Sequence, residues 1–343
     1  MKTIRYPIAF PIAIISVSLL AFSILTSSCS IHPSVNGSVI DTPTPIFVLS
    51  ATKLPGIDSQ DKILIQQQSN IFVVNPDGTD CNLITSHNDI FNAALSNDKT
   101  RVAYFVDGYY YIKNINSGET SQLNQEWIGG IPFGMGWSAD DKKIGFDCAP
   151  GTSTTSEICT IDTADKQFQV LTHSEQMAAP NQNVVGGGAQ FGSWSRDGSH
   201  ILFAIRFTPL AGGHGQGIIQ MLNLNTGAVS TIFDGRGQQT IANVAAPVLS
   251  PDGKTILFQG TVGKLTEIFR INTDGSNLKQ VTQAGHTFDI TYPVWSPNGD
   301  AFFAFTAMDG DPTITGVPTL FSLGGQIIMH LDIGFGRVRS WIK

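Results

Sequence analysis

The pentapeptide Trp194-Ser195-Arg196-Asp197-Gly198 decides the fold, because variants of it recur along the chain. The other copies are Leu95-Ser96-Asn97-Asp98-Lys99, Trp137-Ser138-Ala139-Asp140-Asp141, Leu249-Ser250-Pro251-Asp252-Gly253 and Trp295-Ser296-Pro297-Asn298-Gly299. Consecutive copies begin about 42 to 57 residues apart. A repeat of this length matches one four-stranded blade of a β-propeller.

Short runs with the composition of β-strands follow each copy of the motif. The run directly after each copy is apolar, at residues 102–106, 144–148, 201–205, 256–259 and 302–305. Later runs end in Asn or Asp and then in Leu-Thr or a relative of it, as in 268–272 and 281–282. No segment shows apolar residues at helical spacing for three turns. With 35 glycines, 21 phenylalanines and only 14% charged residues, the composition also favours an all-β domain.

The residues of the motif have structural explanations. Asp-Gly supplies the positive φ angles that a tight hairpin needs. The aromatic residue before the serine is expected on the innermost strand of its blade, where it packs against the neighbouring blade. We therefore interpret acidic residues of the motif, such as Asp197 and Asp252, as turn residues and not as catalytic carboxylates.

The two ends of the repeat region complete each other. The strand from Lys62 to Gln66 has no innermost strand before it, and the segment from Arg337 to Lys343 resembles an innermost strand with nothing after it. Pairing the two segments closes a ring of six four-stranded blades. Closure also leaves no long open sheet edge. The predicted fold is therefore an all-β, six-bladed β-propeller over residues 61–343, closed by the C-terminal strand.

The repeat resembles that of TolB-like propellers, W-S-P-D-G-x-x-I-A-F followed by I-Y-x-x-D-x-D-G and L-T, over essentially all of residues 61–343. The resemblance implies a non-enzymatic protein that binds a protein partner in the cell envelope. TolB itself has an additional N-terminal α/β domain, in whose place this chain has only a short polar segment, so a role in the Tol system is not implied. Similar blades also cap prolyl-oligopeptidase-type hydrolases. The alternative function is a glycan-binding or hydrolytic propeller with a site at the channel mouth.

The N-terminus has the features of an export signal. Lys2 and Arg5 precede an uncharged run, residues 6–28, that is rich in Ile, Leu, Ala and Phe. The run is almost long enough to cross a bilayer, which takes about 20 residues, so an uncleaved membrane anchor is the alternative.

The end of this run resembles the lipobox of bacterial lipoproteins. It reads Leu25-Thr26-Ser27-Ser28-Cys29, with threonine where the family usually has leucine. The resemblance implies removal of a signal peptide, residues 1–28, and lipidation of Cys29, which would hold the protein at the membrane of a bacterial cell envelope. Residues 29–60 are rich in Ser, Thr and Pro and have the composition of a flexible tether.

The charge pattern argues against nucleic acid as a partner. The formal net charge is −7, and loss of Lys2 and Arg5 with residues 1–28 would make it −9. No stripe of Lys and Arg residues occurs that could attract phosphates.

Candidate binding residues lie on the long loops. The Asp-Gly turns belong to one face of the ring. The connections between blades and the middle hairpins belong to the other face and are longer, rich in glycine and poor in aromatic residues, as in 149–156, 173–188, 207–217 and 307–318. Binding residues tend to lie on variable loops held by a rigid frame, so we expect the partner site on this second face and at the channel mouth.

Three histidines and two aspartates follow the outermost strands at similar places: His87, His173, His286, Asp89 and Asp289. Convergence of these side chains near the channel could form a metal or ligand site. Their spacings differ, and the alternative is that they are solvated loop residues. No zinc-type spacing, complete calcium loop or catalytic motif occurs, so no metal or other cofactor is expected.

Arg337 and Arg339 lie on the closing strand, where the other blades place small or apolar residues, namely Ala93, Gly192, Pro247 and Pro293. An arginine near the channel could bind an acidic group of a partner. The alternative is an ordinary surface ion pair.

The chain has four cysteines, of which Cys29 is assigned to lipidation. Cys148 and Cys159 flank one hairpin and could form a disulfide across it, which export permits. Cys81 is then left over, and we expect it to be a small buried apolar residue.

Overall fold

The computed structural model describes Asp58 and residues 60–67, 69–76, 80–87, 89–151, 155–173, 184–209, 215–236, 240–282, 288–308, 316–331 and 336–343. These residues form 24 β-strands and no helix. None of them therefore belongs to a helix long and apolar enough to cross a membrane. The expected signal peptide, Cys29 and most of the tether lie outside the described residues.

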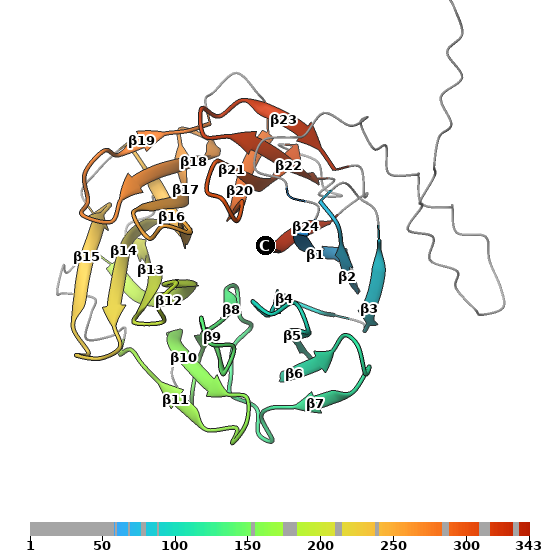
Figure 1. The fold of residues 1–343 in the computed structure, drawn as a ribbon. Coiled ribbons are helices and arrows are strands. Elements are labelled where there is room, and N and C mark those ends of the chain that lie inside the picture. Colours follow the sequence, from blue (N-terminus) through green and yellow to red (C-terminus); the bar gives the residue numbers. More distant parts are fainter. Residues whose placement is uncertain are drawn as a thin grey trace, which may run out of the picture.

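The strands form six four-stranded antiparallel sheets that surround a central channel as the blades of a propeller (Figure 1). From the innermost strand outward, blade 1 has β24 (Arg337–Ile342), β1 (Lys62–Gln67), β2 (Asn70–Val74) and β3 (Asn82–Ser86). In the same order, blade 2 has β4 (Asn92–Leu95), β5 (Arg101–Val106), β6 (Tyr109–Asn114) and β7 (Thr120–Gln122). Blade 3 has β8 (Met135–Trp137), β9 (Lys143–Cys148), β10 (Glu157–Asp162) and β11 (Phe168–Val170). Blade 4 has β12 (Val184–Trp194), β13 (His200–Pro209), β14 (Gln216–Asn223) and β15 (Val229–Asp234). Blade 5 has β16 (Ala242–Leu249), β17 (Thr255–Val262), β18 (Leu265–Asn272) and β19 (Lys279–Gln280). Blade 6 has β20 (Phe288–Trp295), β21 (Ala301–Met308), β22 (Gly316–Ser322) and β23 (Ile327–His330). The predicted all-β, six-bladed architecture is confirmed.

The C-terminal strand closes the ring as predicted. β24 pairs antiparallel with β1, with Ile63 opposite Trp341 and Gln66 opposite Arg337. The register shifts between Leu64 and Ile65, so that Arg339 is the extra residue of a β-bulge. The first blade is thus assembled from the two ends of the propeller (Figure 1).

The Ser-x-Asp-Gly motif builds the same hairpin in successive blades. In blade 4 the Ser195 hydroxyl donates to Asp197 at 2.6 Å and accepts the backbone N–H of His200 at 2.9 Å. Asp197 in turn accepts the backbone N–H of Ser199 at 3.0 Å. Equivalent bonds occur at Ser96, Ser138 and Ser250. The motif therefore specifies a turn by local hydrogen bonds, which explains why it repeats.

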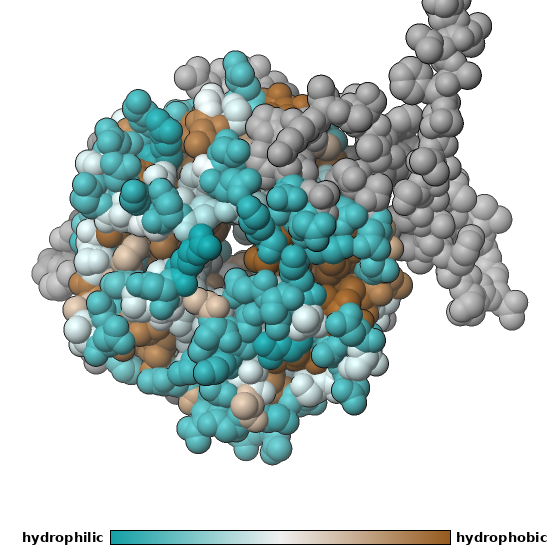
Figure 2. Space-filling model, viewed as in Figure 1, coloured by the Kyte–Doolittle hydropathy of each residue, from teal (hydrophilic) through white to brown (hydrophobic). Residues whose placement is uncertain are grey.

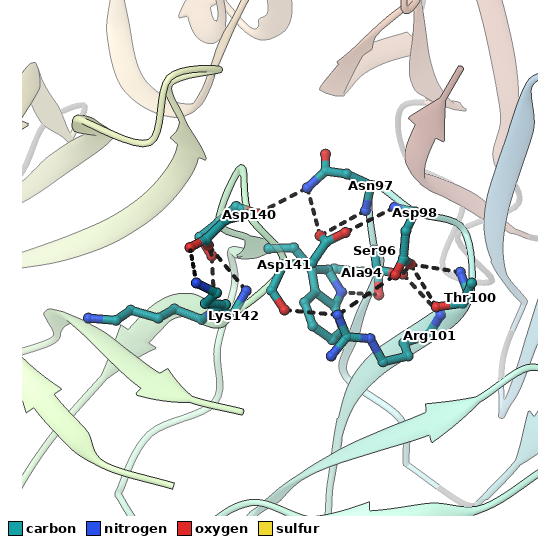
Figure 3. A network of polar contacts seen from close by, with 12 residues as sticks. Ala94, Ser96, Asn97, Asp98, Thr100, Arg101, Asp140, Asp141 and Lys142 are labelled. Carbon is teal, nitrogen blue, oxygen red and sulfur yellow. Dashed lines mark hydrogen bonds and ion pairs between the residues drawn. The ribbon is translucent and has the colours of Figure 1, made fainter. Parts of the chain in front are cut away.

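The glycine position of the motif needs a positive φ in every copy. Gly198, Gly253 and Gly299 have φ between 72° and 74°, whereas the two divergent copies place Lys99 at 60° and Asp141 at 54°. Asp141 links two neighbouring hairpins, because its carboxylate accepts the backbone N–H groups of Asn97 and Asp98 (Figure 3). No comparable contact is made by Lys99, whose ammonium donates only to the Gln60 carbonyl at 3.2 Å.

The aromatic residue of the motif joins neighbouring blades. The indole N–H of Trp137 donates to the Ala94 carbonyl of blade 2 at 3.0 Å. Trp194 and Trp295 make the same bond to the innermost strand before their own. Each blade buries its apolar face against the next, as in the core cluster that contains both Ala94 and Ile144. This confirms the predicted packing role.

The closing strand has a variation of this bond. The Trp341 indole N–H donates at 3.0 Å to the carboxylate of Asp61, which is fully buried. Burial raises the pKa of Asp61, although the bonds from the backbone near Asp58 and from Trp341 partly oppose this shift.

Two disulfide-bonded sites are present among the described cysteines. Cys148 and Cys159, the pair suggested by the sequence, are joined across the β9–β10 hairpin with their Cα atoms 6.0 Å apart. Cys81 is only partly buried, packs against the core cluster of blades 6 and 1, and is itself disulfide-bonded. The expectation that Cys81 is an unpaired buried residue is therefore wrong.

Candidate binding site at the channel mouth

The propeller has two different faces, because successive strands of each blade run in opposite directions. The Ser-x-Asp-Gly hairpins, such as 195–200, lie on what we call the turn face. The connections between blades, such as 123–134, and the hairpins between the second and third strands lie on the opposite face, which we call the loop face. The innermost strands therefore begin at the loop face. Figure 2, which views the molecule along the channel, shows a hollow at the centre of a largely hydrophilic surface.

The described histidines lie away from the channel. His87 follows the outermost strand of blade 1 and stacks on Tyr104 of blade 2, with 5.9 Å between ring centroids. His173 is exposed and follows the outermost strand of blade 3. His286 lies outside the described residues. Because His87 and His173 belong to the outer edges of different blades, the structure does not bring them together.

The two aspartates of the same pattern also have separate surroundings. Asp89 is exposed and has a φ of 64°. Asp289 is the second residue of β20 and accepts the backbone N–H of Thr266 at 2.7 Å, so it links blades 5 and 6. No group of three or more His, Cys, Asp or Glu side chains that could hold a metal ion occurs in the described part of the chain.

Arg339 of the closing strand is hydrogen-bonded to Gln66. Arg339 Nε donates to Gln66 Oε1 at 2.8 Å, and its Nη2 donates to the Phe91 carbonyl at 3.0 Å. Gln66 is in turn opposite Arg337 in the β1–β24 ladder and donates to the Ile90 carbonyl at 2.6 Å. Arg339 therefore connects the closing strand to the beginning of blade 2.

Arg337 lies on the other side of the strand, against blade 6. Its guanidinium carbon is 4.4 Å from the ring centroid of Tyr292 and 4.9 Å from that of Phe305. Stacking on the two ring faces leaves the edge of a guanidinium group, which carries its N–H donors, available for a ligand. Burial, and then the positive charge of Arg337, lowers the pKa of Arg339 to about 9.

Asp147 is a buried carboxylate that orders the connection into blade 3. It is 2% exposed, and it accepts the backbone N–H groups of Phe133 at 2.8 Å, Gly134 at 2.7 Å and Phe191 at 3.4 Å. Burial raises its pKa to about 7, although the three N–H donors act in the opposite direction. The only sequence signal for this residue is an acidic side chain inside the apolar run Ile144-Gly145-Phe146-Asp147-Cys148.

The loop face of blades 2 and 3 carries exposed apolar side chains. They are Phe91 at 42%, Trp127 at 67%, Ile131 at 45% and Phe133 at 56% exposure, and we call them the apolar patch. The Asn92 amide donates to the Pro132 carbonyl at 3.3 Å, which places the Phe91 segment beside residues 131–133. The expectation that the loops of this face are poor in aromatic residues is thus wrong for the β7–β8 connection.

The patch adjoins the arginines. Phe91, a member of the patch, also provides the carbonyl that accepts the Arg339 hydrogen bond. Further out, Trp127 lines a cavity of about 530 Å³ together with Glu126, Lys166 and Phe168. This combination of aromatic rings, guanidinium groups and a cavity is suited to recognition of a ligand, and no nucleophile with an adjacent base is among the residues that form it.

Comparisons with known proteins support the fold. No protein-family model matches the sequence, and no curated protein matches it. TolB from Acinetobacter baumannii superposes with a TM-score of 0.62 at 19% identity, covering 84% of this chain and 68% of that one. A TolB-type structure from Agrobacterium tumefaciens gives 0.61 at 16% identity, with 82% and 92% covered. Oligogalacturonate lyase from Vibrio parahaemolyticus gives 0.50 at 15% identity, with 80% and 74% covered.

These similarities show the fold of the protein. The described part of the chain is a six-bladed β-propeller similar in fold to the TolB structures, as the sequence repeat suggested. At such identities the likeness concerns the fold alone, and propellers of this shape include both binding proteins and enzymes.

Proposed function

We propose that this protein is a non-enzymatic binding propeller of the bacterial cell envelope that recognises a protein partner through its loop face. The observation that carries the proposal is the apolar patch beside Arg339. Three aromatic residues and an isoleucine are exposed on two neighbouring connections, β3–β4 and β7–β8. Exposed apolar groups gathered in one place on a soluble surface mark interaction sites.

The composition of the patch fits a protein interface. Aromatic residues and arginine are enriched at the centres of such interfaces and account for most of their hot spots. Phe133 is held on a rigid frame, because its backbone N–H and that of Gly134 donate to the buried Asp147. An ordered patch loses little conformational entropy when it binds.

The membrane anchor is part of the proposal. A lipidated Cys29 and a tether over residues 29–60 would hold the propeller near the membrane surface. Lipidation converts the cysteine sulfur into a thioether, which cannot join a disulfide. Cys81 is disulfide-bonded in the structure. Because a lipidated Cys29 could not be its partner, a free Cys81 thiol in the mature protein would agree with lipidation of Cys29.

Capture from an envelope extract with variants of the patch tests the proposal. Trp127→Ser and Phe133→Ser together should reduce capture of the partner strongly and leave the melting temperature almost unchanged, because both side chains are exposed. Leu278→Ser is the matched control, since Leu278 is 37% exposed and follows a turn that contacts the turn-face hairpin. Equal capture by the double variant and the wild type would contradict the proposal.

The cavity beside Trp127 favours a glycan as the second candidate ligand. Its volume of about 530 Å³ is in the range of small-ligand sites, and it combines the rings of Trp127 and Phe168 with the charged residues Glu126 and Lys166. Sugar rings pack their C–H bonds on aromatic faces and exchange hydrogen bonds with charged groups. Phe168→Ser separates the two candidates: it should abolish retention on a glycan array and leave capture of the protein partner intact.

A further inference from the structure

The closing strand places two arginines at the channel mouth that have no acidic partner among the described residues. Four ion pairs occur among the described residues, and they involve Lys62, Arg101, Lys142 and Arg236. Neither Arg337 nor Arg339 takes part in any of them. The acceptors of Arg339 are the Gln66 amide and the Phe91 carbonyl, which are both neutral.

The positive charge of Arg337 also acts on Arg339. Both are only partly accessible, and the charge of Arg337 contributes to the low pKa of Arg339. Placing like charges together in a partly desolvated site destabilises the protein unless something compensates them. The rest of the protein is acidic, with 27 Asp and Glu against 20 Lys and Arg residues, yet no carboxylate of the described residues is placed here.

The two arginines are held in ways that leave donors free. The guanidinium carbon of Arg337 lies over the rings of Tyr292 and Phe305, and the group donates no hydrogen bond to any described residue. Arg339 is fixed by Nε and Nη2, which leaves Nη1 available. Preorganised guanidinium donors recognise planar anions. One guanidinium group can donate two parallel hydrogen bonds to a carboxylate in the same plane.

We propose that Arg337 and Arg339 form a carboxylate-binding site, and that its ligand is an acidic segment of the polypeptide that docks on the loop face. This inference rests on the proposed function, because the same partner would place apolar side chains on the patch. The Phe91 carbonyl, bound to Arg339, connects the two sites. A partner with an acidic residue next to aromatic or aliphatic residues would match both.

Arg236 provides a matched control for the arginine site. Its guanidinium also lies over an aromatic ring, 5.9 Å from the centroid of Phe207, and it follows β15 on the loop face. Unlike Arg337, it is already paired with a carboxylate, that of Asp234, at 2.6 Å. Removal of Arg236 takes away one positive charge of the same face without changing the proposed site.

Binding of labelled peptides to the full chain in detergent tests the proposal. A fluorescein-labelled hexaglutamate peptide should bind the wild type, and a hexaglutamine peptide should not. Arg337→Gln and Arg339→Gln should each weaken the binding of hexaglutamate about tenfold or more, as expected for a charge-assisted hydrogen bond. Arg236→Gln should change it less than twofold.

Two further results decide the nature of the site. Arg337→Gln stays interpretable if Arg339→Gln disturbs the closing strand, because Arg337 has no hydrogen bond to lose in the described part of the chain. Citrate serves as the small carboxylate, and binding of citrate tighter than hexaglutamate would overturn the polypeptide as ligand. Equal binding of hexaglutamate by Arg337→Gln, Arg236→Gln and wild type would overturn the carboxylate-binding site. The proposed function is tested separately, by capture of the partner with the serine variants of the apolar patch.

Discussion

Truncation of Trp341 should destabilise the propeller more than any other single change in the closing strand. The side chain is 5% exposed, its ring centroid is 5.1 Å from that of Phe303, and its N–H donates to the buried Asp61 carboxylate. Removal of a buried Trp side chain costs about 3–5 kcal/mol. Loss of a donor to a buried carboxylate adds about 1–3 kcal/mol. The two terms are not fully additive, so we expect Trp341→Ala to lower the free energy of unfolding by about 4 kcal/mol or more.

Equilibrium unfolding in guanidinium chloride, followed by far-UV circular dichroism, measures this loss. Trp341→Phe keeps most of the packing and removes only the hydrogen bond, so it should lose about 1–3 kcal/mol. Trp127→Ala is the matched control, because its side chain is 67% exposed and its removal should cost less than about 0.5 kcal/mol. A loss below about 1 kcal/mol for Trp341→Ala, similar to that of the control, would refute the reasoning that the C-terminal strand locks the ring.

Three further predictions follow from particular side chains. Burial raises the pKa of Asp147 to about 7, so the folded state keeps a proton that the unfolded state loses above about pH 4. The free energy of unfolding should therefore fall as the pH rises from about 4 to 7. Asp147→Asn should remove this part of the pH dependence of the unfolding free energy. Lys99→Gly should raise the stability by about 0.5–1 kcal/mol, because glycine adopts a φ of 60° without strain, and no change in melting temperature would contradict this account of the turn. Cys29→Ala should abolish labelling by a fatty-acid probe and leave an unprocessed precursor, whereas persistent labelling would place the anchor elsewhere.

The fold could be predicted from the sequence because its determinants are local and repeated. The hydrogen bonds of Ser195 and Asp197 lie within one pentapeptide and the residues directly after it. The closure of the ring was predictable for a different reason, since a first strand without a partner and a last strand without a successor complete each other. Periodicity therefore determined the architecture without any knowledge of side-chain contacts.

The site was predictable only in part, because its contacts join distant segments. The arginines were recognisable as unusual residues at an innermost-strand position. Their partners Gln66 and Tyr292 come from the first and last blades, which no local pattern relates. Trp127 and Phe133 belong to a connection of ordinary composition, and their exposure depends on how that connection crosses blades 2 and 3. The pattern was misleading for His87 and His173, because each follows the outermost strand of its blade and so lies far from the axis.

Site-specific photo-cross-linking in cells tests the central claim, recognition through the loop face, most directly. A photoreactive phenylalanine at position 133 replaces an exposed aromatic ring of the apolar patch, and the same group at position 278 replaces an exposed leucine beside the turn face. Our account predicts a discrete cross-linked product with a protein partner from position 133 and none from position 278. A product from position 278 with none from position 133 would contradict it.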